Sequence, residues 1–281
     1  MPELPEVETI KNDLKKIILG KSITDVCVHN PRVIREPSVA AFKKGLIGAK
    51  IKNVLRRGKL LILELSGGKF LTIHLRMTGQ LVYPGGKKAS RVVFGLSGGE
   101  ALDFNDQRLF GELRLMRDWQ SLPFVKNMGP EPLDLTLREF KDMLAVCKGQ
   151  IKPLLMDQGF ICGIGNLYAA EILFRARINP ARRAQSLSVQ EKKSLFSAMQ
   201  KILRLAIKHG GSTIDDYVRL SGAPGGYVAF HRVYGRAGKP CFVCKSAIKR
   251  VTQAGRGTYF CPKCQPSPCV QPIQLQKGRA G

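Results

Sequence analysis

Residues 50–75 read KIKNVLRRGKLLILELSGGKFLTIHL and contain three short runs rich in Ile, Val and Leu. These runs predict strands over 50–55, 60–65 and 70–75, with a turn at Gly67-Gly68. Further runs of the same kind cover 81–83, 91–96, 101–104 and 112–116, with turns at Gly85-Gly86 and Gly98-Gly99. Because the strands are short and follow one another closely, they predict an antiparallel β-sandwich within residues 22–118.

The chain after this block has a helical pattern. Residues 119–134 carry Pro123, Pro130 and Pro132 and no sustained period, which is typical of a linker. Residues 136–147 and 166–176 each have one apolar face and are predicted to be helices. Ser188-Val-Gln-Glu191 is a capping box that should open a long helix ending near His209. The sequence therefore predicts an α+β protein with more than one domain.

The amino terminus, Met1-Pro2-Glu3-Leu4-Pro5-Glu6-Val7-Glu8, combines a proline behind the initiator methionine with three carboxylates. Removal of Met1 would leave Pro2 as a secondary amine with a pKa of about 8, able to attack an electrophilic carbon and form an iminium. Glu3 is placed to donate a proton to a leaving oxygen. The same residues also fit an ordinary capped helix start followed by apolar residues at helical spacing. On this segment alone, both interpretations remain open.

The charge of the chain favours a polyanionic partner. Its 46 Lys and Arg exceed its 21 Asp and Glu and give a formal charge of +25. Residues 217–281 contain Lys and Arg but no acidic residue. We find no apolar run of the ~18 residues that a membrane span needs, no secretory signal and no lipidation motif. The charge therefore predicts binding to nucleic acid rather than to a membrane surface.

Cysteine spacing predicts a metal site near the carboxyl terminus. Cys241-Phe-Val-Cys244 and Cys261-Pro-Lys-Cys264 are two C-x2-C pairs separated by 16 residues. Four thiolates leave no open position for a bound water, so one structural Zn²⁺ is expected. A redox dithiol pair is the alternative, but the βαβ pattern that accompanies such pairs is missing. Cys27, Cys147 and Cys162 are expected to be small core residues, and Cys269 has no predicted partner.

The loop Cys162-Gly163-Ile164-Gly165-Asn166 precedes one of the predicted helices. Two glycines would let the backbone approach a ligand, while free N–H groups and the helix dipole would face an anion. This pattern predicts a phosphate-binding loop. A simple structural turn is the alternative explanation.

Several motifs in one order resemble those of the bacterial formamidopyrimidine-DNA glycosylase family over residues 1–265. They are Pro2-Glu3-Leu4-Pro5-Glu6-Val7-Glu8-Thr9, Gly58-Lys59, His74-Leu75-Arg76-Met77-Thr78-Gly79, Asp106-Gln107-Arg108-Leu109-Phe110-Gly111, Gly163-Ile164-Gly165-Asn166-Leu167-Tyr168-Ala169 and Gly255-Arg256-Gly257-Thr258-Tyr259-Phe260-Cys261. This family excises oxidised purines from DNA. Its members also cleave the strand at the abasic site.

The resemblance implies an N-terminal antiparallel β-sandwich with an N-terminal helix, followed by a helix-two-turns-helix domain that carries a β-hairpin zinc finger. The expected bounds are 1–118 for the catalytic domain, 119–134 for the linker, 135–232 for the helical domain, 233–265 for the zinc finger and 266–281 for a disordered tail rich in Pro and Gln. One structural Zn²⁺ and no organic cofactor are expected. The expected partner of this cytoplasmic monomer is double-stranded DNA with an oxidised base or an abasic site.

The resemblance also implies roles for individual residues. Pro2 would attack C1′ of the damaged nucleoside, Glu3 would assist opening of the sugar ring, and Glu6 would shape the pocket. Lys59 and Arg256 would bind the phosphates that flank the lesion and donate protons during strand cleavage. Met77, Arg108 and Phe110 match a wedge that fills the space left by an extruded base. Further DNA contacts are expected from Arg91, Lys148, Lys152 and Asn166.

The chain departs from the family pattern at two places. Gln107 and Leu109 flank Arg108 where the family has a Pro-Arg-Arg run, which predicts a less rigid and less basic loop. Ala89-Ser90-Arg91 lacks a histidine that often lies near a DNA phosphate, so Arg91 is the remaining candidate for that contact. Residues 210–236, with Gly222, Gly225 and Gly226, resemble the segment that closes over an everted 8-oxoguanine.

Two alternatives stay open at this point. The endonuclease VIII branch shares the fold and the proline but prefers oxidised pyrimidines, and its start resembles Pro-Glu-Gly-Pro where this chain has Leu4. A non-catalytic zinc-ribbon protein that binds DNA would explain the charge and the four cysteines. It would leave Pro2, Glu3 and Lys59 without a reason to occur together.

Overall fold

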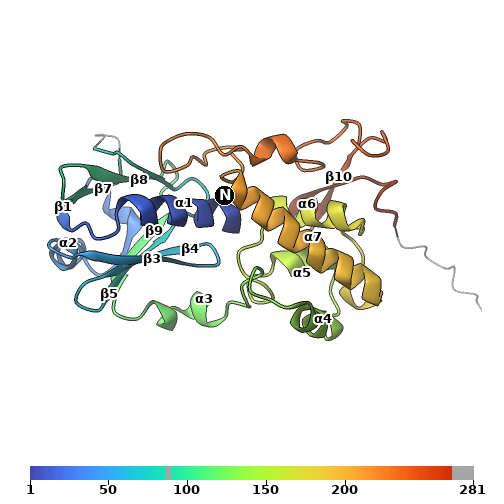
Figure 1. Ribbon diagram of the computed structural model, residues 1–281, viewed down its shortest axis with the longest axis horizontal. Helices are drawn as coiled ribbons and strands as arrows, with labels where there is room; N and C mark the ends of the chain where they lie inside the picture. Colours follow the sequence, from blue (N-terminus) through green and yellow to red (C-terminus); the bar gives the residue numbers. More distant parts are fainter. Residues whose placement is uncertain (87–89, 268–281) are drawn as a thin grey trace, which may run out of the picture.

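The computed structural model describes residues 1–86 and 90–267 and contains a β-rich half and a helical half. Figure 1 shows the two halves side by side along the long axis, with the amino terminus at their junction. The predicted tail from residue 268 onward, Cys269 and Ala89 lie outside the described residues.

The β-rich half is a sandwich of two sheets, as predicted. The first sheet has the order β1-β7-β8-β6 and the second the order β2-β9-β5-β4-β3. Their strands are β1 (Ile23–Val28), β2 (Ile34–Glu36), β3 (Ile51–Arg57), β4 (Leu60–Leu65), β5 (Lys69–His74), β6 (Gln80–Val82), β7 (Val92–Leu96), β8 (Ala101–Asn105) and β9 (Glu112–Met116). The three runs within residues 50–75 form adjacent antiparallel strands, and Leu61 and Leu63 of β4 are buried in the core.

Two details of this half differ from the sequence-based prediction. The sheet is not purely antiparallel, because β2 pairs with β9 in parallel. In addition, the helix α2 (Val39–Leu46) lies within a region that was predicted to contain only strands. This helix is stabilised by burial of Phe42 and Leu46 in the sandwich core. The 3₁₀ helix η1 (Pro31–Val33) precedes β2.

The N-terminal helix α1 (Leu4–Ile17) packs against β3 and β4 of the sandwich. Its apolar positions Val7, Ile10 and Leu14 are buried in the same core as the two sheets. Helical periodicity therefore predicted this helix correctly. Its first turn faces the helical half, where the backbone N–H of Leu4 donates to the carbonyl of Gly163 at 2.9 Å.

The helical half contains α4 (Leu137–Ala145), α5 (Ile151–Met156), α6 (Asn166–Ala176), the 3₁₀ helix η3 (Ala184–Ser186), α7 (Val189–Lys208) and the 3₁₀ helix η4 (Tyr227–Phe230). The bounds of α6 agree with the prediction. The Ser188–Glu191 capping box opens α7, and His209 is its C-cap. Thr136 and Glu139 form a second capping box at the start of α4. The sequence did not predict α5.

A two-stranded hairpin, β10 (Lys249–Gln253) and β11 (Arg256–Phe260), completes the described chain. It packs on α6, because Ala170 and Phe174 of that helix share an apolar cluster with Ile248 and Cys261. The chain is then held through Gln265, whose side chain donates to the carbonyl of Ile178 at 2.8 Å.

Two segments connect the halves. The predicted linker contains the 3₁₀ helix η2 (Trp119–Ser121) and the short helix α3 (Pro123–Lys126), and its Leu122 and Val125 pack against β4. The segment after α7 crosses back over the sandwich, where Tyr217 and Leu220 join the core of the β-rich half. Figure 1 shows this segment above the junction and the linker below it. The junction is thus braced on two sides.

None of the helices in the described part of the chain has both the length and the apolar character needed to cross a bilayer.

Candidate active site

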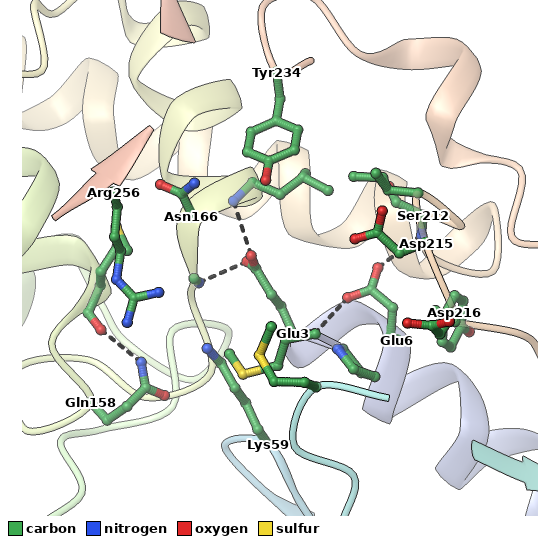
Figure 2. Close-up of a pocket in the computed structure, with 18 residues that line it drawn as sticks. Glu3, Glu6, Lys59, Gln158, Asn166, Ser212, Asp215, Asp216, Tyr234 and Arg256 are labelled. Atoms are coloured by element: carbon green, nitrogen blue, oxygen red, sulfur yellow. Dashed lines mark hydrogen bonds between the residues drawn. The ribbon is translucent and has the colours of Figure 1, made fainter. Parts of the chain in front are cut away.

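A cavity of about 320 Å³ lies at the junction, where the start of α1 meets the start of α6. Its lining includes seven of the predicted site residues: Pro2, Glu3, Glu6, Lys59, Met77, Asn166 and Arg256. Figure 2 shows Glu3 in the middle, with Lys59 and Arg256 on one side and Glu6, Asp215 and Asp216 on the other. The cavity therefore has a cationic side and an acidic side, and the carboxylate next to Pro2 lies between them.

Glu3 occupies the amino-terminal end of α6. Its carboxylate oxygens accept hydrogen bonds from the backbone N–H groups of Gly165 at 2.7 Å, Leu167 at 3.0 Å and Tyr168 at 3.4 Å. These are the free donors that a helix start leaves without an intrahelical partner. The sequence predicted an anion at this loop but assigned it to a bound phosphate. In the structure, the anion that these three donors bind is the side chain of Glu3.

Two glycines make this contact possible. A Cβ on Gly165 would lie 2.5 Å from Cδ of Glu3, so any larger residue would displace the carboxylate. Gly163 has a φ of 87°, and a Cβ there would lie 2.7 Å from Cβ of Leu4. The prediction that the glycines allow close approach was therefore correct, with the first turn of α1 as the approaching group.

Glu6 is buried next to Glu3 and is held by three donors. Its carboxylate accepts from the N–H of Glu3 at 2.8 Å, from the hydroxyl of Tyr168 at 2.5 Å and from the N–H of Ser212 at 2.8 Å. Burial and the charge of Glu3 raise the pKa of Glu6 to about 7, although the three hydrogen bonds act in the opposite direction. Near neutral pH this carboxyl group is therefore divided between its two protonation states.

Lys59 lies with Gly58 in the turn between β3 and β4, and Glu131 of the linker fixes this turn. Glu131 accepts from the backbone N–H of Gly58 at 2.7 Å and pairs with Arg56 at 2.8 Å and Arg57 at 3.4 Å. Arg57 also donates to the carbonyl of Gly129 at 2.7 Å. The three residues ahead of Lys59 are therefore tied to the linker, which orients the lysine into the cavity.

Lys59 itself is only 7% exposed. Burial lowers its pKa, while the nearby Glu3 and Glu6 carboxylates oppose that shift. A lysine in such a site is more easily deprotonated than a surface lysine, which suits a group that must donate a proton to a leaving oxygen.

Arg256 reaches the cavity from the turn of the β10–β11 hairpin. Asn166 fastens this hairpin to the start of α6, because its side-chain amide donates to the carbonyl of Gly257 at 3.0 Å. The other side of Asn166 accepts from Nζ of Lys152 at 2.6 Å. Lys152 is buried, and burial together with the charge of Arg256 lowers its pKa to about 8. Lys152 and Arg256 also line a neighbouring small cavity.

The three predicted wedge residues lie on two loops that are joined to each other. Thr78, next to Met77, donates to the carboxylate of Asp106, and Asp106 also accepts from the N–H of Arg108 at 3.1 Å. Met77 and Phe110 are 43% and 47% exposed, so neither is a core residue. The guanidinium of Arg108 stacks over the ring of Phe110 at 4.7 Å. Large apolar side chains exposed on adjoining loops are available for insertion into a base stack.

The two remaining predicted DNA contacts do not line the cavity. Arg91 donates through Nε to the carbonyl of Asp106 at 2.9 Å and therefore braces the loop that carries Arg108. This contact and the bonds to Asp106 hold the loop in place, although Gln107 and Leu109 replace the family residues. Lys148 is exposed on the loop before α5.

The four predicted metal ligands come together as expected. One ligand atom from each of Cys241, Cys244, Cys261 and Cys264 lies within 4.8 Å of the others. The Sγ atoms of Cys241 and Cys264 are 3.9 Å apart, and those of Cys244 and Cys261 are 3.3 Å apart. A tetrahedral zinc with Zn–S bonds of about 2.3 Å requires sulfur atoms about 3.8 Å apart. The geometry therefore fits Zn²⁺ and is too open for disulfides.

Among the other cysteines in the described part of the chain, Cys162 is the fully buried one. It accepts a hydrogen bond from Arg57 at 3.0 Å, and burial raises the pKa of its thiol to about 12. Cys27 and Cys147 are partly exposed. Cys147 packs against the core of the helical half, whereas Cys27 is in neither core, so the prediction was wrong for Cys27.

Sequence reasoning missed part of the lining. Gln158 donates to the carbonyl of Ile164 and accepts from the N–H of Gly163, so it supports the loop that holds Glu3. The segment after α7 contributes Ile214, Asp215, Asp216 and Tyr217, and Tyr234 also lines the cavity, above Glu3 in Figure 2. The segment 210–236, whose sequence resembles the segment that closes over an everted base, thus reaches the cavity through these residues. Gly222, Gly225 and Gly226 do not line it.

Three known domain families match the chain. Residues 1–113 match the model of the formamidopyrimidine-DNA glycosylase N-terminal domain, and residues 128–218 match that of the formamidopyrimidine-DNA glycosylase H2TH domain. Residues 238–266 match a zinc finger found in FPG and IleRS. These three matches cover most of the chain.

Similar full-length proteins are found in bacteria. Formamidopyrimidine-DNA glycosylase of Pelotomaculum thermopropionicum is 44% identical over 273 residues, which cover 94% of this chain and 99% of the relative. The MutM (Fpg) crystal structure from Thermus thermophilus has a TM-score of 0.85 at 40% identity, covering 94% of this chain and 98% of that chain. Lactococcus lactis Fpg in complex with abasic-site DNA has a TM-score of 0.86 at 35% identity, covering 94% and 100%.

Proposed function

The chain belongs to the formamidopyrimidine-DNA glycosylase family, and on that premise we propose that it excises oxidised purines from duplex DNA and then cleaves the strand at the abasic site. It is a DNA glycosylase of base excision repair. The substrates are 8-oxoguanine and formamidopyrimidines, and the lyase step follows on the same enzyme. The observation that carries the proposal is the position of Pro2 beside the helix-bound Glu3, in a cavity that is cationic on one side.

The first reaction uses the amine that removal of Met1 exposes. The nitrogen of Pro2 forms a bond to C1′ of the damaged nucleotide while the N-glycosidic bond breaks, and its electron pair leaves with the base, which takes up a proton. The Glu3 carboxylate takes up the proton that the Pro2 nitrogen loses on bonding to C1′ and gives it to the sugar ring oxygen as the C1′–O4′ bond opens. An iminium between Pro2 and C1′ remains, and Glu6 fixes the start of α1 during both steps.

Strand cleavage then uses the cationic side of the cavity. Loss of a proton from C2′ of the iminium expels the 3′ phosphate, and a second elimination expels the 5′ phosphate. Lys59 and Arg256 lie where they can bind these phosphates and protonate the leaving oxygens. Asn166 and Lys152 hold the hairpin of Arg256 at the required place.

Base extrusion relies on the two joined loops of the β-rich half. Met77, Arg108 and Phe110 enter the stack when the damaged base leaves it and offset an unstacking cost of a few kcal/mol. Arg91 holds the loop of Arg108 in place through its hydrogen bond to the carbonyl of Asp106. Its positive charge also attracts a DNA phosphate. Lys148, on the helical half, contacts the phosphate backbone of the DNA. The partner is therefore a duplex with an oxidised base or an abasic site.

The four cysteines bind one structural Zn²⁺. The metal ties the two C-x2-C turns together and thereby orients the β10–β11 hairpin that presents Arg256. Four sulfur ligands leave no position for a reacting water, so the expected contribution of the metal is to folding. The reacting groups are those of the protein itself, and no organic cofactor is invoked.

The remaining assignments concern organisation and location. We place the catalytic domain at 1–118, the linker at 119–134, the helical domain at 135–232 and the zinc finger at 233–265. The end of β9 at Met116, the start of α4 at Leu137 and the anchoring of Gln265 support these bounds. The enzyme acts as a monomer in the bacterial cytoplasm, where its DNA substrate lies.

A panel of duplexes tests the substrate class. Excision should be fastest from a duplex with 8-oxoguanine and slower from one with thymine glycol, and a preformed abasic site should be cleaved. Ile214→Ala removes an exposed apolar side chain that lines the cavity. It should slow removal of 8-oxoguanine by about tenfold, the usual effect of one apolar pocket contact. Cleavage of the abasic site should be unaffected, since no base needs to be held.

Ile47→Ala is the matched control, because Ile47 has a similar exposure but follows α2 outside the cavity. Equal losses on both substrates in Ile214→Ala would show that this residue is structural rather than a base contact. A preference of the intact protein for thymine glycol would favour the endonuclease VIII alternative, and binding without any cleavage would favour the zinc-ribbon alternative.

Loss of zinc should abolish DNA binding while Pro2 stays chemically intact. A structural zinc site contributes on the order of 10 kcal/mol to folding of its own unit. Cys244→Ser should therefore unfold the hairpin, release Arg256 and break the contact of Asn166 with Gly257. Fluorescence anisotropy on an abasic duplex measures binding, and Cys27→Ser, outside the cysteine cluster, should bind like the wild type. Full binding by protein shown to be free of metal would contradict this expectation.

A further inference from the structure

A chain of buried polar groups leads from Glu6 into the helical half. The hydroxyl of Tyr168 donates to Oε1 of Glu6 at 2.5 Å and lies 3.4 Å from the hydroxyl of Ser212. The hydroxyl of Ser212 lies 2.9 Å from Nε2 of His231. All four side chains are buried, and the rings of Tyr227 and Tyr234 flank His231 at 5.7 and 6.2 Å. Water is therefore largely kept from this chain.

We propose that Ser212 and His231 are positioning residues of the catalytic site, which act through the hydroxyl of Tyr168 and the backbone N–H of Ser212 to control the protonation state of Glu6 at the start of α1. The proposal deepens the proposed function, because it assigns how one carboxyl of that site is regulated. Neither residue lies next to Pro2 in sequence. His231 does not line the cavity, so it acts only through the groups between it and Glu6.

The chain can be completed in two directions. With ionised Glu6, Nε2–H of His231 donates to Ser212, Ser212 donates to Tyr168, and Tyr168 donates to Glu6. With protonated Glu6, each hydroxyl turns around, and Nε2 of His231 accepts from Ser212. The two tautomers of a neutral imidazole serve these two directions. Burial lowers the pKa of His231 to about 4, so its ring is neutral near pH 7 in both cases.

The ionised state of Glu6 is the one that the chain supports. Ionised Glu6 can accept from Glu3, Tyr168 and Ser212 at once, and the bond to the N–H of Glu3 fixes the first turn of α1. Protonated Glu6 donates from Oε1 to Tyr168, and a protonated oxygen is a weaker acceptor for the N–H of Ser212, which bonds the same atom. A firm Ser212–His231 bond keeps the N–H and the hydroxyl of Ser212 oriented toward Glu6 and Tyr168.

Other ionisable groups surround Glu6 and also influence its pKa. They are Glu3 on α1, Lys59 after β3, Tyr217 after α7 and Tyr227 on η4, with Asp215 and Asp216 across the cavity. Among them Tyr227 packs against the ring of His231 at 5.7 Å, and His231→Phe keeps an aromatic ring in that place. A shift in the titration of Glu6 after such a change therefore reports on the hydrogen-bonded chain.

The test is a carboxyl titration by NMR in protein labelled with ¹³C at glutamate side-chain carboxyl carbons. Glu6→Gln identifies the Glu6 signal, whose midpoint in the wild type is expected at about 7. Donors to the anion lower the midpoint, so their loss should raise it. Tyr168→Phe removes a direct bond and should raise it by about one unit. His231→Phe should raise it by about half a unit, and the acid limb of the excision profile should move the same way.

Matched variants separate this effect from a change in folding. His231→Gln keeps a side chain that donates and accepts and should titrate like the wild type. His209→Phe changes a second histidine, which stacks on Phe230 of η4 at 4.2 Å, and should also titrate like the wild type. Ser212→Ala keeps the backbone donor and should raise the midpoint even if His231→Phe does not fold. The double variant of Ser212 and His231 should add nothing further.

Two results would overturn the proposal. One is a folded His231→Phe or Ser212→Ala protein in which Glu6 titrates as in the wild type. The other is an equal shift in His209→Phe. Because the titration is read in the free protein, it is independent of the reaction. A wild type that shows the titration but releases no base would overturn the proposed function and leave the hydrogen-bonded chain intact.

Discussion

Sodium borohydride is expected to link the Met1-processed protein covalently to a duplex that contains 8-oxoguanine, with the bond at Pro2. Attack by a secondary amine at C1′ gives an iminium, which borohydride reduces to a stable amine. A Gly-Ser extension ahead of Pro2 turns this nitrogen into an amide and should abolish the product. Pro2→Gly should form it about 10²-fold more slowly, because a freer backbone misplaces the nucleophile. Gel shift and mass spectrometry of the tryptic peptide 2–11 measure the product.

The structure makes this prediction specific, because two lysines lie close to the same cavity. Lys59 lines it, and Lys152 contacts it through Asn166. Burial lowers the pKa of both amines, so both are candidates for a competing imine. A cross-link on either lysine in the wild type would disprove the proline mechanism. Lys152→Ala should therefore keep the cross-link at Pro2, even if it weakens the attachment of the β10–β11 hairpin to Asn166.

Local patterns predicted the elements whose ends are fixed by nearby residues. The capping box at Ser188 was located correctly because its donors and acceptors lie within one turn. The start of α6 was located from its apolar period, although its N–H groups bind the distant Glu3. The strand β2 and the helix α2 were not predicted. β2 has three residues and exists through its pairing with the distant β9, and α2 depends on burial of Phe42 and Leu46. Such elements owe their stability to tertiary contacts rather than to propensity.

The same distinction applies to the site. The sequence showed that the loop at Gly163 and Gly165 presents N–H donors, but it could not show that their acceptor is Glu3, 162 residues away from Gly165. It likewise predicted Lys59 without its support, since the clamp at Glu131 lies 73 residues from Gly58. The residue types within a short motif indicate which chemistry a site can perform. The partner that completes each hydrogen bond depends on the packing of the two halves.

Glu3→Gln is expected to slow base excision by ~10²-fold or more, because the amide cannot donate the proton that ring opening needs. The structure adds a second reason. Both carboxylate oxygens accept backbone N–H groups at the start of α6, and an NH₂ group cannot accept in the same place. Single-turnover release of 8-oxoguanine measures the loss. Binding to a duplex with a tetrahydrofuran abasic analogue should persist, since Lys59, Arg256 and the wedge are untouched.

The second reason must be separated from the first, because a displaced side chain would also slow the reaction. If the loss came only from the changed contact with α6, binding of the analogue and thermal stability would fall together with excision. If it comes from proton transfer, excision falls while both stay close to the wild type. Glu64→Gln, on β4 outside the cavity, is the matched control and should excise at the wild-type rate. Wild-type excision by Glu3→Gln would remove Glu3 from the mechanism.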